Sequence, residues 1–212
     1  MSDFRIVSGE KVVLIGDSIT EWRQRQGDFA PLGNGYVSIA VNLVTARYPE
    51  REIEWINRGI GGDVVQGLVN RWTADVIEEN PDWVSIAIGI NNVARDHGSD
   101  RSRDECLEDF ENSYRNILQR TRRETDAKLV VFEIFYVAGE DMQKRDLNVD
   151  VYNEIIHRLS AEYDALLVPV NLAFTQAISK RPSYSWTMGD GVHPLQVGHT
   201  LIALTFLKTL DW

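Results

Sequence analysis

Short runs of β-branched and other apolar residues alternate along the chain with longer segments in which apolar positions recur every three or four residues. The short runs predict buried strands, and the longer segments predict helices with one apolar face. The predicted strands cover residues 12–15, 53–57, 83–88, 129–132 and 166–168. Strands that alternate with helices favour a parallel sheet covered on both faces, here an α/β three-layer sandwich with five central strands.

One helical repeat shows the pattern most clearly. It puts five apolar residues on a single stripe that we expect to face the sheet: Val151, Ile155, Ile156, Leu159 and Tyr163. Similar repeats predict helices over residues 36–48, 106–121 and 196–210. No internal repeat, low-complexity tract or Pro/Gly-rich linker divides the 212 residues. We therefore expect one domain over residues 1–212, a length that allows a substantial core.

Composition and charge narrow the class of partner. Apolar residues make up 43% and charged residues 25% of the chain, as in ordinary compact proteins. The chain has 32 acidic and 22 basic residues, and its formal charge of -10 repels phosphate backbones and anionic lipids. Residues 1–11 are polar, and no apolar run reaches the length of a signal peptide or a membrane span. We expect a cytoplasmic protein whose partner is a small molecule, not a nucleic acid or a membrane.

Four polar, glycine-containing clusters stand out against this background. GDSIT (16–20), GIGGD (59–63) and GINN (89–92) follow the first three predicted strands, and DGVHP (190–194) precedes the last predicted helix. In open parallel sheets, ligands bind beyond the carboxyl ends of the strands. We therefore expect the four clusters to converge on one site.

The first and last clusters together predict a nucleophile and its base. Ser18 follows a buried strand, where a tight turn can present its hydroxyl to a cleft, although such residues also make ordinary turns and helix caps. His193 is the best-placed base, because Asp190 can hold one ring nitrogen and leave the other for the serine proton. The alternative for this pair is an Asx turn before a Pro-initiated helix.

The two middle clusters offer hydrogen-bond donors for an oxyanion. Gly62 has a backbone N–H without an obstructing side chain, Asn91 has a side-chain amide, and the N–H of Ser18 is a third donor. Fixed donors of this kind are worth about 3–4 kcal/mol each in acyl transfer. Taken singly, Gly62 and Asn91 fit better as turn residues, with Asp63 as a helix cap. Together with the serine and the Asp/His pair they favour acyl transfer over coincidence.

Metal and thiol chemistry find little support in the sequence. His193 and His199 are six residues apart, off any common helical face, and no Cys or carboxylate spacing completes a metal site. We interpret His97, His157 and His199 as structural and the lone Cys106 as incidental. The prediction is a site without metal or cofactor.

These residues resemble a known family. The four clusters look like the four blocks of the SGNH (GDSL) hydrolases, with Ser18, Gly62, Asn91 and His193 at the positions that name the family. The resemblance spans residues 11–207. It implies a flavodoxin-like sandwich and a serine-ester mechanism that passes through an acyl-enzyme without a cofactor.

Within that family the chain is most similar to bacterial acetylxylan esterases that act on acetylated xylo-oligosaccharides. The similar segments are LGNGYVSIAV, INRGIGGDVVQGLVNRW, NPDWVSIAIGIN and DGVHPLQVGHTLIA. The chain differs from those esterases in having Asn92 where they usually carry aspartate, in the loop of residues 21–26, and in the three residues that separate Trp186 from Asp190. These differences fall around the acyl and alcohol pockets, and the residues predicted to bind substrate are Asp17, Trp22, Asn92 and Trp186.

The sequence therefore predicts a serine-dependent carboxylic-ester hydrolase that deacetylates short acetylated sugars. A lysophospholipase or thioesterase of the same family is the nearest alternative, and it needs a long apolar groove near Trp22 and Trp186. A non-catalytic module that binds phosphate or flavin on GDSIT is the alternative from another class, but it needs no His193 with Asp190 and would be expected to carry a P-loop lysine. Trp212 fits burial between copies in a homo-oligomer or folding back on its own domain.

Overall fold

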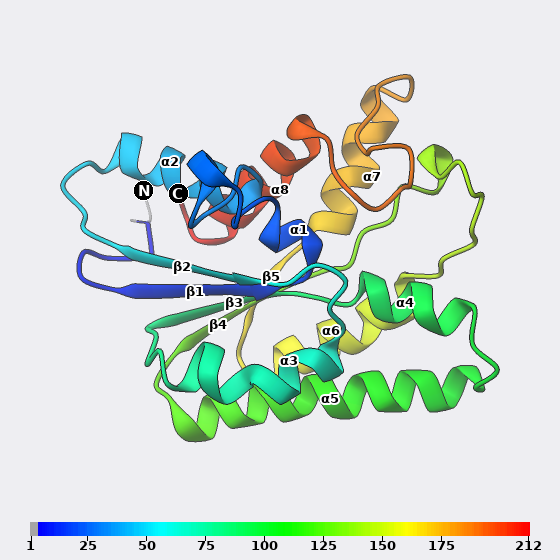
Figure 1. Ribbon diagram of the computed structural model, residues 1–212, viewed down its shortest axis with the longest axis horizontal. Coiled ribbons are helices and arrows are strands. Elements are labelled where there is room, and N and C mark those ends of the chain that lie inside the picture. The colour runs from blue at the N-terminus through cyan, green and yellow to red at the C-terminus, as the bar shows by residue number, and fades with distance from the viewer. Residues whose placement is uncertain (1–3) are drawn as a thin grey trace.

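A five-stranded parallel sheet forms the centre of the computed structural model, which describes residues 4–212 (Figure 1). Its strands stand in the order β2-β1-β3-β4-β5. They are β1 (Lys11–Gly16), β2 (Glu54–Gly59), β3 (Trp83–Ala87), β4 (Lys128–Phe132) and β5 (Leu166–Val168). The predicted fold class and the five predicted strands are confirmed, and β2 continues two residues beyond its expected end. Residues 1–3 of the predicted domain and of the polar N-terminal segment lie outside the described residues.

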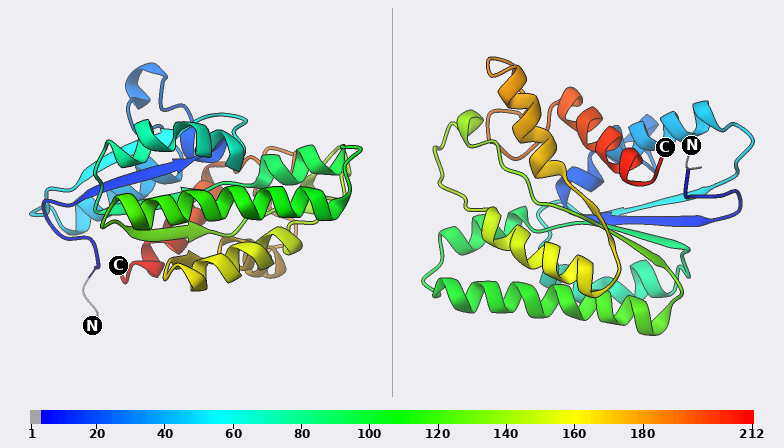
Figure 2. Two further views of the ribbon diagram at one scale, coloured as in Figure 1. Left: turned by 90° about the horizontal axis from the view of Figure 1, so that it is seen from below. Right: turned by 180° about the vertical axis from the view of Figure 1, so that it is seen from behind.

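Helices cover both faces of the sheet. One layer holds α1 (Ser18–Glu21), α2 (Tyr36–Arg47), α7 (Val170–Lys180) and α8 (Gln196–Thr209), and the other holds α3 (Val65–Trp72), α4 (Ile90–His97), α5 (Arg103–Glu124) and α6 (Asp150–Glu162). Figure 2 shows α5 and α6 side by side beneath the sheet. Among residues 4–212, no helix combines the length and the apolarity needed to cross a membrane.

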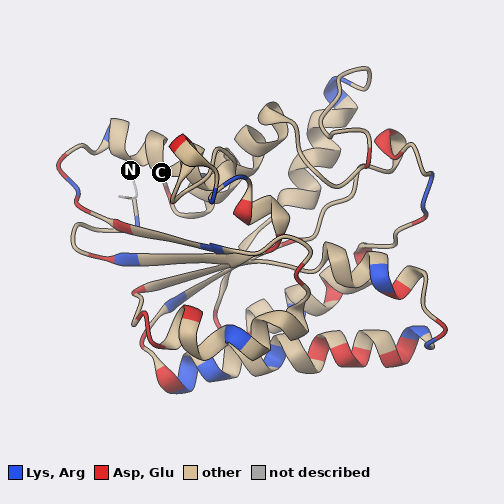
Figure 3. Ribbon diagram, in the orientation of Figure 1, with Lys and Arg blue, Asp and Glu red and all other residues tan. Residues whose placement is uncertain are grey.

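The apolar pattern accounts for the core. Residues 12–15 of β1 are fully buried, as expected for a strand with helices on both sides. On α6, Ile155, Ile156 and Leu159 of the predicted stripe are buried, and burial of each such side chain contributes about 1.5–3 kcal/mol. The charged residues of the long α5 are exposed or half-buried, and Figure 3 shows them spread along the helix. A capping box between Ser102 and Glu105 fixes its start.

Strand register brings three of the four clusters to one edge of the sheet. Gly16, the last residue of β1, pairs with Gly59 of β2 and with Ala87 of β3. The chain leaves these three neighbouring strands at the same level, so residues 17–20, 60–63 and 88–92 begin side by side. Glycine is required at position 16, because a Cβ there would collide with the carbonyl oxygen of Ala87 and the hydroxyl of Thr20.

Candidate active site

A chain of hydrogen bonds links Ser18, His193 and Asp190. Ser18 Oγ lies 2.9 Å from His193 Nε2, and His193 Nδ1 lies 2.6 Å from Asp190 Oδ2. Asp190 Oδ1 accepts the backbone N–H groups of Val192 at 2.9 Å and His193 at 2.8 Å. Partial burial raises the pKa of Asp190, but the hydrogen bonds from the His193 ring and these N–H groups outweigh it and lower the pKa. An ionised Asp190 holds the proton on Nδ1, which leaves the Nε2 lone pair facing the serine hydroxyl.

Ser18 is presented by a sharp turn between β1 and the short helix α1. The Asp17 carboxylate caps α1 by accepting the N–H of Ile19 at 3.0 Å. Asp17 is only 2% exposed, and this burial raises its pKa to about 7, against the lowering effects of the Ile19 N–H and of His193. The Asp17 carboxylate therefore serves this turn, and substrate contact through Asp17 stays a prediction.

Gly62 and Asn91 lie on the two loops beside the nucleophile. A Cβ built on Gly61 would be 3.9 Å from Ser18 Cβ, so the chain before Gly62 passes next to the serine. Gly62 adopts a φ of 76°, a conformation that favours glycine. Asn91 Nδ2 donates one hydrogen bond to the carbonyl of Asp63 at 2.9 Å, which ties the two loops together. Its second N–H stays available, and within residues 4–212 the N–H groups of Ser18 and Gly62 have no acceptor.

Asn92 lies beneath the site and does not line it. Its side chain is fully buried, its Oδ1 accepts the N–H of Val65 at 3.0 Å, and its Nδ2 donates to Gln66 Oε1 at 2.9 Å. These bonds attach the start of α3 to α4. The prediction that Asn92 contacts substrate is wrong, because both ends of its amide are occupied by protein.

The two tryptophans predicted as pocket walls lie in different places. The Trp22 ring sits between two histidine rings, with its centroid 4.6 Å from that of His199 and 6.0 Å from that of His193. Trp186 instead packs edge-on against Phe174 and Tyr184 and lines a groove between α7 and α8. Trp22 therefore lies beside His193, whereas Trp186 lies at a separate groove, and substrate contact by either tryptophan stays a prediction.

The remaining histidines have structural surroundings. His199 is fully buried, and its Nδ1 accepts the N–H of Tyr36 at 3.2 Å. Burial, assisted by the charge of His193, lowers the pKa of His199 to about 3 and keeps it neutral. His157 is exposed on α6 and bonds to Glu133 at 2.8 Å, and His97 ends α4. Between residues 4 and 212, no three His, Cys, Asp or Glu side chains are grouped to hold a metal ion.

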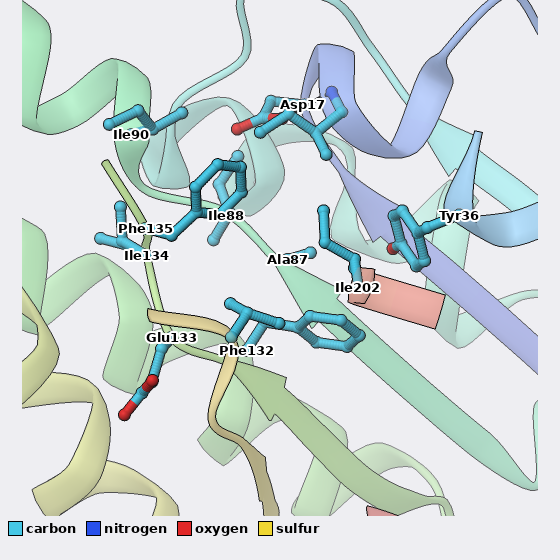
Figure 4. Close-up of a pocket in the computed structure, with 12 residues that line it drawn as sticks. Asp17, Tyr36, Ala87, Ile88, Ile90, Phe132, Glu133, Ile134, Phe135 and Ile202 are labelled. Atoms are coloured by element: carbon cyan, nitrogen blue, oxygen red, sulfur yellow. Dashed lines mark hydrogen bonds between the residues drawn. The ribbon is translucent and has the colours of Figure 1, made fainter. Parts of the chain in front are cut away.

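A small cavity lies under the turn that carries Ser18, but neither Ser18 nor His193 lines it. Asp17 and Ile19, the two neighbours of Ser18, contribute to its wall, together with apolar side chains from the ends of β3 and β4. Figure 4 shows Ile88, Ile90 and Phe135 around it, with Asp17 at one end. The space inside it that is open to the centre of a water molecule is about 30 Å³.

Sequence reasoning missed the side chains that support the Asp190–His193 loop. Glu140 accepts the N–H groups of Trp186 and Thr187, and Arg145 Nη2 donates to the Asp190 carbonyl at 2.7 Å. Both lie more than 40 residues before the loop that they hold. No spacing pattern marks them, because their partners are main-chain atoms.

Comparison with known proteins agrees with this geometry. The model of the GDSL-like lipase/acylhydrolase family matches residues 14–201. An acetylxylan esterase of Geobacillus stearothermophilus is 35% identical over 216 residues, which cover 98% of this chain and 97% of the relative.

Solved structures extend the comparison. The crystal structure of an acetylxylan esterase from the same organism matches with a TM-score of 0.84 at 34% identity, over 98% of this chain and 97% of that one. Variants of that esterase with a serine, an aspartate or a histidine changed to alanine are described as catalytic mutants. An alpha/beta hydrolase from the metagenome of Lake Arreo, Spain, is 30% identical with a TM-score of 0.84, over 99% of this chain and 98% of that one.

Proposed function

This chain belongs to the GDSL-like lipase/acylhydrolase family and is a carboxylic-ester hydrolase, and we propose that it deacetylates short acetylated sugars through an acyl-enzyme on Ser18. The observation that carries the proposal is the continuous bonding from Ser18 Oγ through the His193 ring to Asp190, at 2.9 and 2.6 Å. Neither a surface turn nor a phosphate-binding loop requires a serine, a histidine and an aspartate that are hydrogen-bonded in series.

The reaction runs in two halves. Ser18 Oγ attacks the ester carbonyl carbon while His193 Nε2 takes the hydroxyl proton, and Asp190 stabilises the resulting imidazolium. The bond to the alcohol oxygen then breaks, and His193 gives its proton to the leaving alcohol. A water molecule that loses its proton to the same Nε2 next attacks the acyl-enzyme. The bond to Ser18 Oγ then breaks, His193 returns that proton to Oγ, and acetate is released.

Hydrogen bonds to the developing oxyanion are the second part of the proposal. The free N–H groups of Ser18 and Gly62 and the second amide N–H of Asn91 are the donors. The Asn91 bond to Asp63 O supports this role, since it fixes the amide before substrate arrives.

One observation favours an acetyl group over a long acyl chain. Trp22 and Trp186, which a long apolar groove was expected to join, do not line a common surface. The likeness to an acetylxylan esterase and to structures described as an acetyl-xylooligosaccharide esterase supports a sugar as the alcohol. The cytoplasmic location and a homo-oligomeric state stay predictions.

The test is hydrolysis of 4-nitrophenyl acetate, butyrate and octanoate, and release of acetate from acetylated xylo-oligosaccharides. We expect kcat/KM to fall by about tenfold or more from acetate to octanoate, because Trp22 and Trp186 do not form the long apolar groove that an octanoyl chain needs. Ser18→Ala is expected to abolish turnover of every substrate. A matched control is Ser179→Ala, since this exposed serine donates only to Gln176 O and its loss should leave rates unchanged. Equal rates for all chain lengths would reject the acetyl preference, and an active Ser18→Ala variant would reject the acyl-enzyme.

A further inference from the structure

Three consecutive carbonyl groups around Asp190 are held by one distant segment. We define residues 186–193 as the base loop and residues 137–145 as the clamp segment. The carbonyl of Gly189 accepts Met142 N–H at 3.0 Å, that of Asp190 accepts Arg145 Nη2 at 2.7 Å, and that of Gly191 accepts Val137 N–H at 2.8 Å. In Figure 1 the clamp segment is the yellow-green stretch after β4, beside the orange loop between α7 and α8.

The clamp segment also holds the beginning of the base loop. Glu140 accepts the N–H of Trp186 at 2.7 Å, and its other oxygen accepts the N–H and the hydroxyl of Thr187 at 2.6 and 2.7 Å. One segment therefore accepts from the start of the loop and donates to its centre. Because these bonds hold the base loop at two places, they fix both its position and its orientation relative to the clamp segment.

The guanidinium of Arg145 is itself fixed before it reaches the loop. Its Nε donates to Asp141 at 2.7 Å, and Tyr136 O–H bonds to the same carboxylate oxygen at 2.7 Å. The Asp141 side chain is fully buried, which by itself raises its pKa, but the bonds from Tyr136 and Arg145 outweigh burial and lower the pKa to about 2. The Asp141–Arg145 pair therefore stays charged across the range in which an esterase works.

Arg145 has a role that backbone geometry alone cannot fill. Asp190 is flanked by Gly189 and Gly191, whose φ values of 85° and 69° let the chain reverse on either side of it. Such a turn is easily deformed, because glycine restricts its backbone least. The carbonyls of both glycines receive backbone donors, whereas the carbonyl of Asp190 receives only the Arg145 side chain.

We propose that Arg145 is a positioning residue for catalysis, which sets the pose of the Asp190–His193 pair by holding the Asp190 carbonyl. The inference rests on the proposed function, because the position of His193 Nε2 relative to Ser18 Oγ affects the rate only if His193 takes the serine proton. Without the guanidinium the Asp190 peptide can rotate. The Asp190 carboxylate is then no longer held in place for its 2.6 Å bond to the His193 ring. Small misplacements of this kind reduce kcat strongly while the binding of a small ester is unaffected.

The test compares Arg145→Ala and Arg145→Lys with the parent on 4-nitrophenyl acetate. We expect Arg145→Ala to lower kcat about tenfold to hundredfold at unchanged KM. Arg145→Lys should fall in between, because an ammonium group cannot bond Asp141 and the Asp190 carbonyl in the same fork geometry. Low concentrations of guanidinium chloride should restore part of the lost rate to Arg145→Ala, since the vacated site is partly open to solvent. A residue that only stabilised the fold would show no such recovery.

The matched control is Arg122→Ala. Arg122 also donates from its guanidinium to main-chain carbonyls, those of Ala127 and Asp164 at 3.2 and 3.0 Å, but between α5, β4 and the start of β5. Its removal should leave kcat unchanged. Equal kcat in Arg145→Ala and Arg122→Ala, or a loss in Arg145→Ala that guanidinium does not reduce, would overturn the proposal.

Hydrogen exchange separates this proposal from the esterase assignment. In Arg145→Ala, peptides covering residues 186–195 should exchange faster than in the parent, and in Arg122→Ala they should not. This readout requires no turnover. A parent without esterase activity would reject the proposed function, whereas unchanged exchange in the base loop would reject the clamp.

Discussion

The two halves of the active site are positioned by different means. The sheet half consists of Ser18, Gly62 and Asn91, which follow the neighbouring strands β1, β2 and β3. The loop half consists of Asp190 and His193, which lie between α7 and α8 and depend on the clamp segment. Strand register fixes the first half, and hydrogen bonds from a segment far away in the sequence fix the second.

This difference explains what a sequence reveals about such a site. Residues that directly follow predicted strands can be placed at the carboxyl edge of a parallel sheet from the order of strands and helices alone. The position of the loop half follows from no periodic pattern. That Asp190 and His193 lie next to Ser18 is expected from chemistry instead, because a serine nucleophile requires a base.

The strongest test of the comparison is to remove the reacting group of each half. Ser18→Ala and His193→Ala should each lower kcat by on the order of 10⁴-fold to 10⁶-fold, and the double variant should be no slower than either single one. The reason is that the hydroxyl and the imidazole act as one unit across a 2.9 Å bond. The measurement is kcat with 4-nitrophenyl acetate, corrected for the uncatalysed rate. Additive losses in the double variant would mean that the two halves work separately.

A smaller effect is expected within the sheet half alone. Asn91→Ala should lower kcat by about 10²-fold to 10³-fold, because one oxyanion donor is lost while Ser18 and His193 stay in place. KM for 4-nitrophenyl acetate should change little, since the amide acts on the transition state. A parallel rise in KM with unchanged kcat would instead assign Asn91 to substrate binding.

Most of the fold could be predicted, and two of the helices that were missed, α1 and α4, share a physical reason. Predicted helices such as α5 and α6 have long apolar stripes that signal the sheet beneath them. The four-residue α1 is too short to show a helical period, and its start depends on the cap by Asp17. Similarly, α4 begins inside the GINN cluster, where glycine and asparagine suggested a turn. Local hydrogen bonds decide these short elements, and hydrophobic periodicity does not report them.

The burial of two residues predicted to bind substrate has a related cause. Asp17 and Asn92 stand beside Ser18 and Asn91 in the sequence. Neighbouring side chains at a strand end or in a helix point in different directions, so one member of each pair faces the core. The structure buries Asp17 and Asn92 to 2% and 0% exposure. They support Ser18 and the start of α3 from below.

The buried carboxyl of the sheet half gives a pH-dependent prediction. Burial raises the pKa of Asp17 to about 7 from 3.8, so the folded protein holds the proton more tightly than the unfolded chain does. The stability linked to this proton is present below about pH 4 and is lost as the pH rises through 7. Asp17→Asn keeps the cap without a charge and should therefore be more stable than the parent by about 4 kcal/mol above pH 7.

Urea unfolding of both proteins at about pH 4 and about pH 8 measures the difference. At the lower pH the two stabilities should be close, because Asp17 is then protonated in the folded protein. A constant difference at both pH values would mean that Asp17 is ionised throughout, with a partner that compensates its burial.

The smallest expected effect concerns Asn92, beneath the site. In Asn92→Asp one carboxylate oxygen can still accept the N–H of Val65, and the N-terminus of α3 favours a negative charge there. The other oxygen meets Gln66, whose amide can turn to donate at the expense of its 3.2 Å bond to Asp109. Because these gains and losses offset one another beneath the site, kcat/KM for acetylated xylo-oligosaccharides should stay within about threefold of the parent. A tenfold change in KM with unaltered thermal stability would show that residue 92 contacts substrate. A side chain that only joins α3 to α4 cannot alter substrate binding without also altering stability.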